Sequence, residues 1–314
     1  MTFGNATGCL CATLVAIFLA TGAVGQPRTG RQEPDTIRTA TVARPEVGAC
    51  RLRTALVAGT AMGGAIILLD KAWYTQYDRG PFHSFDDSGE WLQMDKAGHV
   101  FSAYTLGRWG HAAWQRCGTS ERDGILIGGG LGFLFLAGVE VLDGTSSGWG
   151  FSWSDMLANT TGAGFFMGQE VLWGEQRSTL KLSAHPTPYA DQRPDLLGEG
   201  LGERILKDYN GQTIWWSTNL WSFAKQSRLP HWLNVAVGYG GEGMTTAFPN
   251  TNERTGPDDR FRQFYVAPDV DLTRIRSGSA VVRTLLFVLN GIKVPLPALE
   301  FRSNGRILAH GLYF

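Results

Sequence analysis

The chain has 314 residues, enough for one large domain or two ordinary ones. Its 28 Lys and Arg residues balance 28 Asp and Glu residues. A net charge of zero argues against a nucleic-acid-binding protein and against a polybasic membrane patch. The chain also contains 41 Gly and 11 Trp residues, a combination typical of closely packed helices or of β-structure at an interface.

The N-terminus predicts export from the cytoplasm. An apolar run from about Cys9 to Val24 is followed by small residues before Gln26, which is the pattern of a cleaved signal peptide over residues 1–25. An uncleaved membrane anchor is the alternative. No lipobox cysteine lies at the end of the run. Residues 26–50 are rich in Arg, Thr, Pro and Gly and predict an exposed linker.

Residues 51–174 predict a domain of four helices joined by polar loops, over residues 51–74, 90–116, 122–142 and 154–173. The apolar part of the first helix is shorter than the ~20 residues that a membrane span needs. Ser88 is a candidate N-cap for the second helix, and Ser152 or Ser154 for the fourth. The glycine run over residues 128–132 disfavours a helix unless another backbone packs closely against it.

The C-terminal part changes character. Residues 175–204 contain three prolines and predict a second linker, and residues 205–314 predict a β-rich region. The pairs Asn210-Gly211 and Asn304-Gly305 lie between strand-like runs and predict hairpins. Residues 280–291 fit a helix or a buried strand. The predicted fold class is therefore α+β, with a four-helix up-down hydrophobic bundle followed by a β-hairpin-rich C-terminal region.

Ionisable residues interrupt the apolar helices at one predicted end of the bundle. Asp95 and His99 are four residues apart, as are Asp155 and Asn159, so each pair shares a helix face. Up-down packing gathers the predicted site at this end: Asp95, Lys96, His99, Glu140, Asp155 and Asn159, with Asp70, Lys71 and Asp143 beside them. Such groups mark a functional site, and a buried ion network that fixes the helix register is the alternative.

Two chemistries fit this set. Asp95, His99, Glu140 and Asp155 offer the oxygen and nitrogen ligands that suit zinc or manganese. Alternatively, His99 is a general base oriented by a carboxylate, and Lys96 binds an anionic group. No HExxH motif or paired histidine is present.

The segments "DKAGHVFSAY" and "EVLDGTSSGWGFSWSDMLANTTGAG" resemble the YfiM-like family of uncharacterised bacterial proteins, which are described as predicted periplasmic lipoproteins. The order of Asp95, Lys96, His99, Glu140, Asp155, Asn159 and Gly162 is also similar, more distantly, to that of VanZ-like membrane proteins. Tyr104 departs from the pattern because it lies five residues after His99, off the His99 face of the helix.

The resemblance implies an uncharacterised cell-envelope protein. The basic residues at the end opposite the site predict a cytoplasmic location for that end, whereas a cleaved signal peptide places the mature N-terminus at the same end outside, so we predict a protein of the periplasm or outer membrane. VanZ-like proteins are associated with glycopeptide-antibiotic tolerance, which points to envelope lipid or peptidoglycan. We therefore expect the polar site to act on or bind an envelope lipid or a lipid-linked substrate. A membrane or envelope lipid is the expected partner, and nucleic acid is not. The alternative is a non-catalytic envelope-binding or scaffold protein.

Two cysteines remain if the signal peptide is cleaved. Cys50 precedes the first predicted helix and Cys117 follows the second, and an antiparallel hairpin brings those two ends together. In an oxidising compartment we expect a Cys50–Cys117 disulfide. Two unrelated buried thiols are the alternative, because sequence does not determine connectivity.

Overall fold

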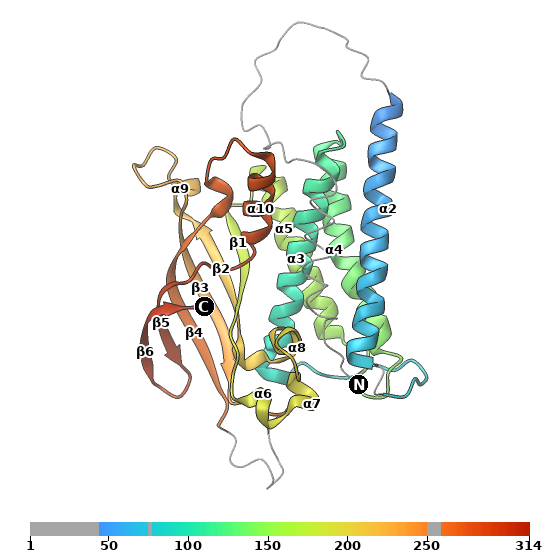
Figure 1. The fold of residues 1–314 in the computed structure, drawn as a ribbon, viewed down its shortest axis with the longest axis vertical. Helices are drawn as coiled ribbons and strands as arrows, with labels where there is room; N and C mark the ends of the chain where they lie inside the picture. Colours follow the sequence, from blue (N-terminus) through green and yellow to red (C-terminus); the bar gives the residue numbers. More distant parts are fainter. Residues whose placement is uncertain (1–43, 75–76, 250–258) are drawn as a thin grey trace, which may run out of the picture.

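The computed structural model describes residues 44–74, 77–249 and 259–314. The predicted signal peptide and most of the first linker lie outside these residues. The fold is α+β, with a layer of long helices beside a six-stranded antiparallel sheet (Figure 1).

Among the described residues, the helical layer contains four long helices. They are α2 (Arg44–Leu69), α3 (Met94–Gln115), α4 (Glu121–Asp143) and α5 (Trp153–Trp173). A π-helical turn, η1 (Asp70–Tyr74), continues α2, and a 3-10 turn, η2 (Glu90–Gln93), precedes α3. Helices α3, α4 and α5 pack on one another, whereas α2 lies along the outside of this group and is mostly exposed (Figure 1).

Glycine allows the close approach of α3, α4 and α5. A Cβ atom added at Gly132 would lie 2.3 Å from the carbonyl oxygen of Ala103, and one at Gly128 would lie 2.5 Å from that of Gly107. One added at Gly162 of α5 would lie 2.2 Å from the carbonyl oxygen of Val100. The predicted packing of a second backbone against the glycine run is therefore confirmed.

Two of these helices are long and apolar enough to cross a membrane, by length and composition, namely the segments Glu46–Leu69 and Glu121–Asp143. The expectation that the first helix is too short for a span is wrong. Helix α2 begins at Arg44, inside the expected linker, so it is longer than predicted.

The disulfide is confirmed. Cys50 and Cys117 are bonded, with their Cα atoms 5.5 Å apart and a sequence separation of 67. Arg51 adds a hydrogen bond from Nη2 to the carbonyl oxygen of Gly118, at 2.9 Å. Because α2 packs so little on its neighbours, these links at one end contribute much of its attachment.

The sheet is a meander in which each strand pairs with the next in the chain. Its strands are β1 (Ser178–Ala184), β2 (Gln212–Asn219), β3 (Leu233–Glu242), β4 (Phe261–Val270), β5 (Leu296–Arg302) and β6 (Ile307–Tyr313). Short helices occupy the connections: α6 (Tyr189–Gln192), α7 (Pro194–Leu197), α8 (Leu201–Lys207), η3 (Tyr209–Gly211), α9 (Leu220–Phe223), η4 (Leu272–Arg274) and α10 (Ala280–Leu289).

The sheet exposes apolar residues on its outer face and buries many polar residues on its inner face, beside a small cluster of Trp215, Ala236, Tyr265, Ala267 and Ala298. Along β3, Val235 and Val237 are exposed while Asn234 is buried, and along β4, Val266 is exposed while Asp269 is buried. Soluble antiparallel sheets place apolar residues inward. An apolar outer face with a polar inner face is typical of β-structure whose outer side contacts lipid.

The polar inner face is held together by buried ion pairs. Lys181 Nζ lies 2.7 Å from Asp269 Oδ2, and Lys293 Nζ lies 3.5 Å from Asp269 Oδ1. Both ammonium groups also donate to backbone carbonyl oxygens, so the buried charges are compensated.

Two predictions about the C-terminal half need correction. The expected linker over residues 175–204 contains β1, α6, α7 and the start of α8. Asn210-Gly211 forms the 3-10 turn η3 instead of a hairpin, because Asp208 caps that turn through Asn210. The Asn304-Gly305 hairpin between β5 and β6 is confirmed, with φ of 87° at Gly305. Residues 280–289 form α10, which resolves the ambiguity there in favour of a helix.

Candidate functional site

The structure brings all six predicted site residues together. They come from the start of α3, the last turn of α4 and the start of α5, which meet at the lower end of the molecule in Figure 1. Asp95, Lys96 and His99 belong to α3, Glu140 to α4, and Asp155 and Asn159 to α5.

Lys96 is the hub of one half of this cluster. Its Nζ lies 2.6 Å from Asp87 Oδ2, 2.9 Å from Asp95 Oδ2 and 3.0 Å from Asp155 Oδ1. Burial would lower the pKa of Lys96, but these carboxylates outweigh it and raise that pKa. One ammonium therefore joins a loop, α3 and α5, and it has no N–H left for another partner.

Asp87 is a site residue that the sequence did not reveal. Its Oδ1 accepts hydrogen bonds from Ser152 Oγ at 2.5 Å and Ser154 Oγ at 2.6 Å. Burial would raise its pKa, but hydrogen bonds with Asp155 and Lys96 lower it to about 2. The predicted Ser152 cap is confirmed, since its Oγ also accepts from the Asp155 backbone N–H at 3.0 Å.

The other half of the cluster consists of the residues that contact His99. Its Nδ1 lies 2.9 Å from Asn159 Oδ1, an amide oxygen that only accepts, so Nδ1 carries a proton. Its Nε2 lies 3.7 Å from Glu140 Oε1 and 3.9 Å from Asp95 Oδ1. The other oxygen of Glu140 accepts the Ser152 backbone N–H at 3.1 Å, which fixes the carboxyl group beside the ring.

The site holds protons at neutral pH. Burial would lower the pKa of His99, but the negative charges of Asp95, Asp155 and Glu140 raise it. Burial raises the pKa of Glu140 to about 7, and burial together with repulsion from Asp95 raises that of Asp155 to about 8. Groups that titrate near 7 are suited to proton transfer at physiological pH.

Two buried polar atoms beside His99 lack partners among the described residues. Glu140 Oε1 and Asn159 Nδ2 make no hydrogen bond there, although Glu140 is 1% and Asn159 0% exposed. Buried polar groups are nearly always bonded. A ligand that offers one donor and one acceptor next to His99 would satisfy both atoms.

The sheet layer reaches into the site through Tyr209, which lies just before β2. Its OH donates to Asp95 Oδ1 at 2.8 Å. This contact spans 114 residues of sequence, so no local pattern could have predicted it. The carboxylate of Asp95 thus accepts hydrogen bonds from Tyr209 and Lys96 and faces the positive charge of His99. Burial would raise the pKa of Asp95, but these three partners outweigh it and lower that pKa.

A strained turn starts α3. Trp91, Leu92 and Gln93 have φ values of 47°, 52° and 64°, a left-handed conformation that costs roughly 1–2 kcal/mol per residue without glycine. The sheet layer holds the turn, because Ala247 accepts from the Trp91 backbone at 2.8 Å and Tyr239 OH donates to the Leu92 carbonyl. The predicted Ser88 cap is wrong, since Gln93 occupies the N-cap position of α3.

A metal site is the competing interpretation. Asp95, His99 and Asp155 present ligand atoms within 4.8 Å of one another. However, Lys96 Nζ bonds both carboxylates, so a divalent cation there would face the lysine charge at short range. The geometry therefore favours acid–base chemistry at His99 over a metal centre.

Neighbouring predicted residues lie outside the cluster. Asp70 pairs with Arg79, and Asp143 accepts a hydrogen bond from Tyr74 OH at 2.5 Å. Tyr104 lies against β1, where its OH donates to the Ser178 carbonyl at 3.2 Å, as its departure from the resembled pattern implied.

Residues 83–168 match the model of a family described as "Predicted periplasmic lipoprotein (DUF2279)". The matched segment contains Asp87 and all six predicted site residues. No curated protein and no solved structure matches the chain. The match supports similarity to an uncharacterised family of envelope lipoproteins and confirms the predicted location in the cell envelope. The finer resemblance to YfiM-like or VanZ-like proteins stays a prediction.

Removing the lysine hub should destabilise the fold. Lys96→Met leaves Asp87, Asp95 and Asp155 facing one another without a cation, and breaking a buried ion pair typically costs about 3–5 kcal/mol. Denaturant unfolding at pH 7 measures this loss. Lys225→Met, which removes a half-exposed lysine, is the control and should change stability by less than ~1 kcal/mol. Equal stability of the two variants would contradict the role given to Lys96.

Glu140 should make stability fall as pH rises. Its folded pKa of about 7 lies above its ordinary value of 4.5, so the folded state holds the proton more tightly. The stabilisation is complete below about pH 4.5 and is lost as pH rises through about 7. Glu140→Gln, which mimics the protonated acid, should flatten the change in unfolding free energy between pH 5 and 8 by on the order of 2 kcal/mol.

Glu121→Gln, at an exposed position of the same helix, is the control for that comparison and should leave the wild-type pH profile in place. His99 and Asp155 contribute with the same sign, so the Glu140→Gln profile keeps a residual slope. Parallel profiles for wild type and Glu140→Gln would contradict the raised pKa.

Proposed function

We propose that this protein is a cell-envelope enzyme that acts on a lipid or lipid-linked substrate, with His99 as its general acid–base and Glu140 as the group that exchanges protons with it. The observation that carries the proposal is the pairing of His99 Nε2 with Glu140 Oε1 at 3.7 Å, beside a His99 Nδ1 that Asn159 fixes.

The roles follow from which atoms are already used. Lys96 and its three carboxylates satisfy one another, so they supply rigidity and a fixed negative field. His99 Nε2 and Glu140 Oε1 make no short hydrogen bond within the described residues, so they are available to a substrate hydroxyl or leaving group. Protonated His99 donates to such a group, and its conjugate base removes a proton from a nucleophile.

Exposed apolar side chains near the site support a lipid-linked substrate. Trp153 and Leu157 flank Asp155 on α5 and are 72% and 68% exposed. Phe82, on the loop that leads to Asp87, is 58% exposed, and its ring lies 5.5 Å from that of Phe151. Aromatic residues exposed beside a polar site are typical of the boundary between a bilayer and water.

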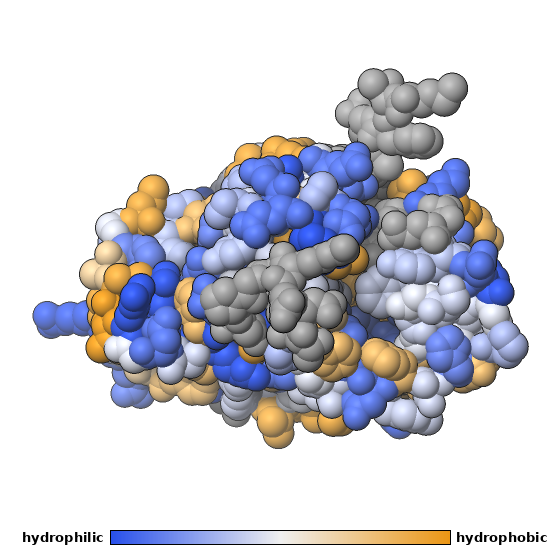
Figure 2. All heavy atoms as spheres, turned by 90° about the horizontal axis from the view of Figure 1, so that it is seen from below, coloured by the Kyte–Doolittle hydropathy of each residue, from blue (hydrophilic) through white to orange (hydrophobic). Residues whose placement is uncertain are grey.

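The distribution of hydropathy on the site end fits the same interpretation. Seen from this end, polar residues cover much of the surface, and hydrophobic residues gather mainly along its margins (Figure 2). Those margins correspond to the sides of the molecule, where α2, α4, α5 and the outer face of the sheet expose large apolar residues. Apolar sides next to a polar end suit a protein that contacts a bilayer surface.

A non-catalytic envelope-binding or scaffold protein is the second candidate. The complete pairing of Lys96 favours it, because that half of the cluster is built as a structural ion network. The two functions differ in what they require of His99, since a scaffold needs only that the helices remain packed.

Replacing His99 separates the two. His99→Gln keeps a polar side chain of similar size with an amide group near the position of Nε2, but it cannot exchange protons near neutral pH. The variant should unfold cooperatively but fail to complement a strain that lacks the gene. Whole-cell lipid extracts of cells that carry the variant should show the same accumulated envelope lipids as extracts of the deletion strain. His111→Gln is the control, because His111 lies on the same helix next to Glu121 and outside the site.

Full complementation by folded His99→Gln would overturn the enzymatic proposal and leave the scaffold function. Loss of function in His111→Gln as well would show that helix α3 is sensitive to any such change, and the lipid profile of His99→Gln would then no longer support acid–base chemistry.

A further inference from the structure

A second surface feature lies on the other side of α5, between its outer face and the outer face of the sheet. It is an open groove of about 740 Å³ lined mainly by apolar side chains. Gly164 and Gly168 form its helical wall, and a Cβ at either position would meet no atom within 4 Å. Trp216, Val235 and Val237 of the sheet form the opposite wall and are 50%, 40% and 52% exposed.

The groove continues into a polar pocket. Phe223 lines both, and the pocket is further lined by Arg177, Ser222, Lys225 and Ser227. The guanidinium of Arg177 lies 4.8 Å from the ring centre of Trp173 and 5.3 Å from that of Phe223. A cation is thus stacked on the aromatic side chains that close the apolar groove.

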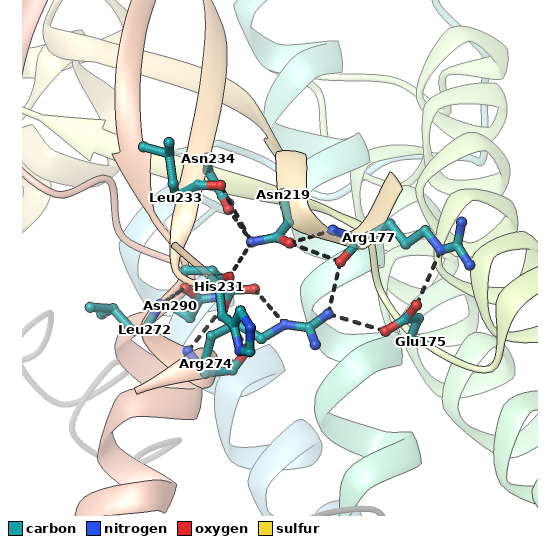
Figure 3. A network of polar contacts seen from close by, with 12 residues as sticks. Glu175, Arg177, Asn219, His231, Leu233, Asn234, Leu272, Arg274 and Asn290 are labelled. Carbon is teal, nitrogen blue, oxygen red and sulfur yellow. Dashed lines mark hydrogen bonds and ion pairs between the residues drawn. The ribbon is translucent and has the colours of Figure 1, made fainter. Parts of the chain in front are cut away.

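The charge at this junction is positive. Glu175 is contacted by Arg177 Nε at 3.2 Å, Lys225 Nζ at 2.9 Å and Arg274 Nη2 at 3.1 Å. Arg274 also contacts Asp271, at 3.5 Å, so three cations face two carboxylates. Figure 3 shows Glu175 between Arg177 and Arg274. The terminal nitrogens of Arg177 donate to none of the described residues, and Lys225 is 52% exposed.

We propose that this groove and pocket form a binding site for an anionic phospholipid, with an acyl chain in the groove and the phosphate on Arg177 and Lys225. The planar guanidinium of Arg177 has both terminal NH2 groups available for bidentate contact with phosphate oxygens. The site is separate from His99, because it lies along the C-terminal half of α5 and just beyond it, while the His99 cluster lies at the start of α5. It therefore stands whether or not His99 is catalytic.

The lining favours a hydrocarbon chain over a peptide. The side chain of Gln169 is already bonded to the backbone of Ser178, at 3.0 Å from Nε2 and 2.8 Å to Oε1. Thr218 Oγ1 is bonded to Ser178 Oγ at 2.9 Å. A peptide backbone in the groove would lose its hydrogen bonds to water without replacement, whereas a hydrocarbon chain needs none.

The test is native mass spectrometry of the full-length protein in detergent doped with phosphatidylglycerol, phosphatidylcholine or oleate. Wild type should retain one phosphatidylglycerol molecule at least tenfold more tightly than either competitor. Arg177→Gln combined with Lys225→Gln should weaken phosphatidylglycerol binding at least tenfold. Gly168→Leu, which fills the groove in open space, should do the same while α5 stays folded.

Two matched controls use the same chemistry elsewhere. Arg228→Gln with Arg276→Gln removes the same charge from the same end of the molecule outside the pocket, and Gly130→Leu places the same side chain at an open position of α4. Both should bind as wild type does, as should His99→Gln. Unchanged binding in either test variant would overturn the proposal, as would equal binding of phosphatidylcholine or oleate, which would show an apolar groove indifferent to the headgroup.

Discussion

The structure depends on how one buried ammonium group is neutralised. Lys96 contacts carboxylates from its own helix, from the loop that precedes that helix, and from α5, which lies more than fifty residues further along the chain. A buried lysine without such partners is costly, and so are three carboxylates without the lysine. The arrangement of α3 and α5 that satisfies Lys96 is also the one that aligns His99 with Asn159. Glycine lets the helices come close enough for both contacts.

The same arrangement divides the cluster into two parts with different chemistry. Around Lys96 each of the three carboxyl groups contacts the ammonium within 3.0 Å, and the pKa of Asp87 falls to about 2. Around His99 the contacts to Glu140 and Asp95 are longer, at 3.7 and 3.9 Å, and Glu140 Oε1 makes no hydrogen bond to the described residues. The pKa of Glu140 rises to about 7 because the group is buried. A rigid, fully paired half next to a half that exchanges protons is how a protein holds a reactive group in place without neutralising it.

Much of this could be predicted from local sequence. The i,i+4 spacing of Asp95 with His99 and of Asp155 with Asn159 placed each pair on one helix face, and the short loops brought those faces together. Gly128 and Gly132 indicated close helix packing, and Cys50 and Cys117 indicated the disulfide. Local sequence did not predict the features that depend on contacts between distant segments. Asp87 lies in a loop that looks solvated, and Tyr209 reaches Asp95 from the sheet.

The start of α3 could not be predicted for a related reason. Ser88 has the right side chain for a cap, but the sheet layer imposes a left-handed turn at Trp91, Leu92 and Gln93 instead. Likewise, β1 lies in a stretch with too many prolines nearby to look like a strand, and pairing with β2 along its whole length creates it. Tertiary contacts outweighed local propensity at each of these positions.

His99 stays protonated because buried carboxylates surround it, with its Nε2 facing Glu140. Nitrogen-15 NMR of the His99 ring across pH tests this directly. We expect a protonated Nδ1 throughout, a pKa of His99 above the ordinary histidine value of about 6.5, and a lower pKa of His99 in Glu140→Gln. A ring that titrates near 6.5 and does not respond to Glu140→Gln would contradict it.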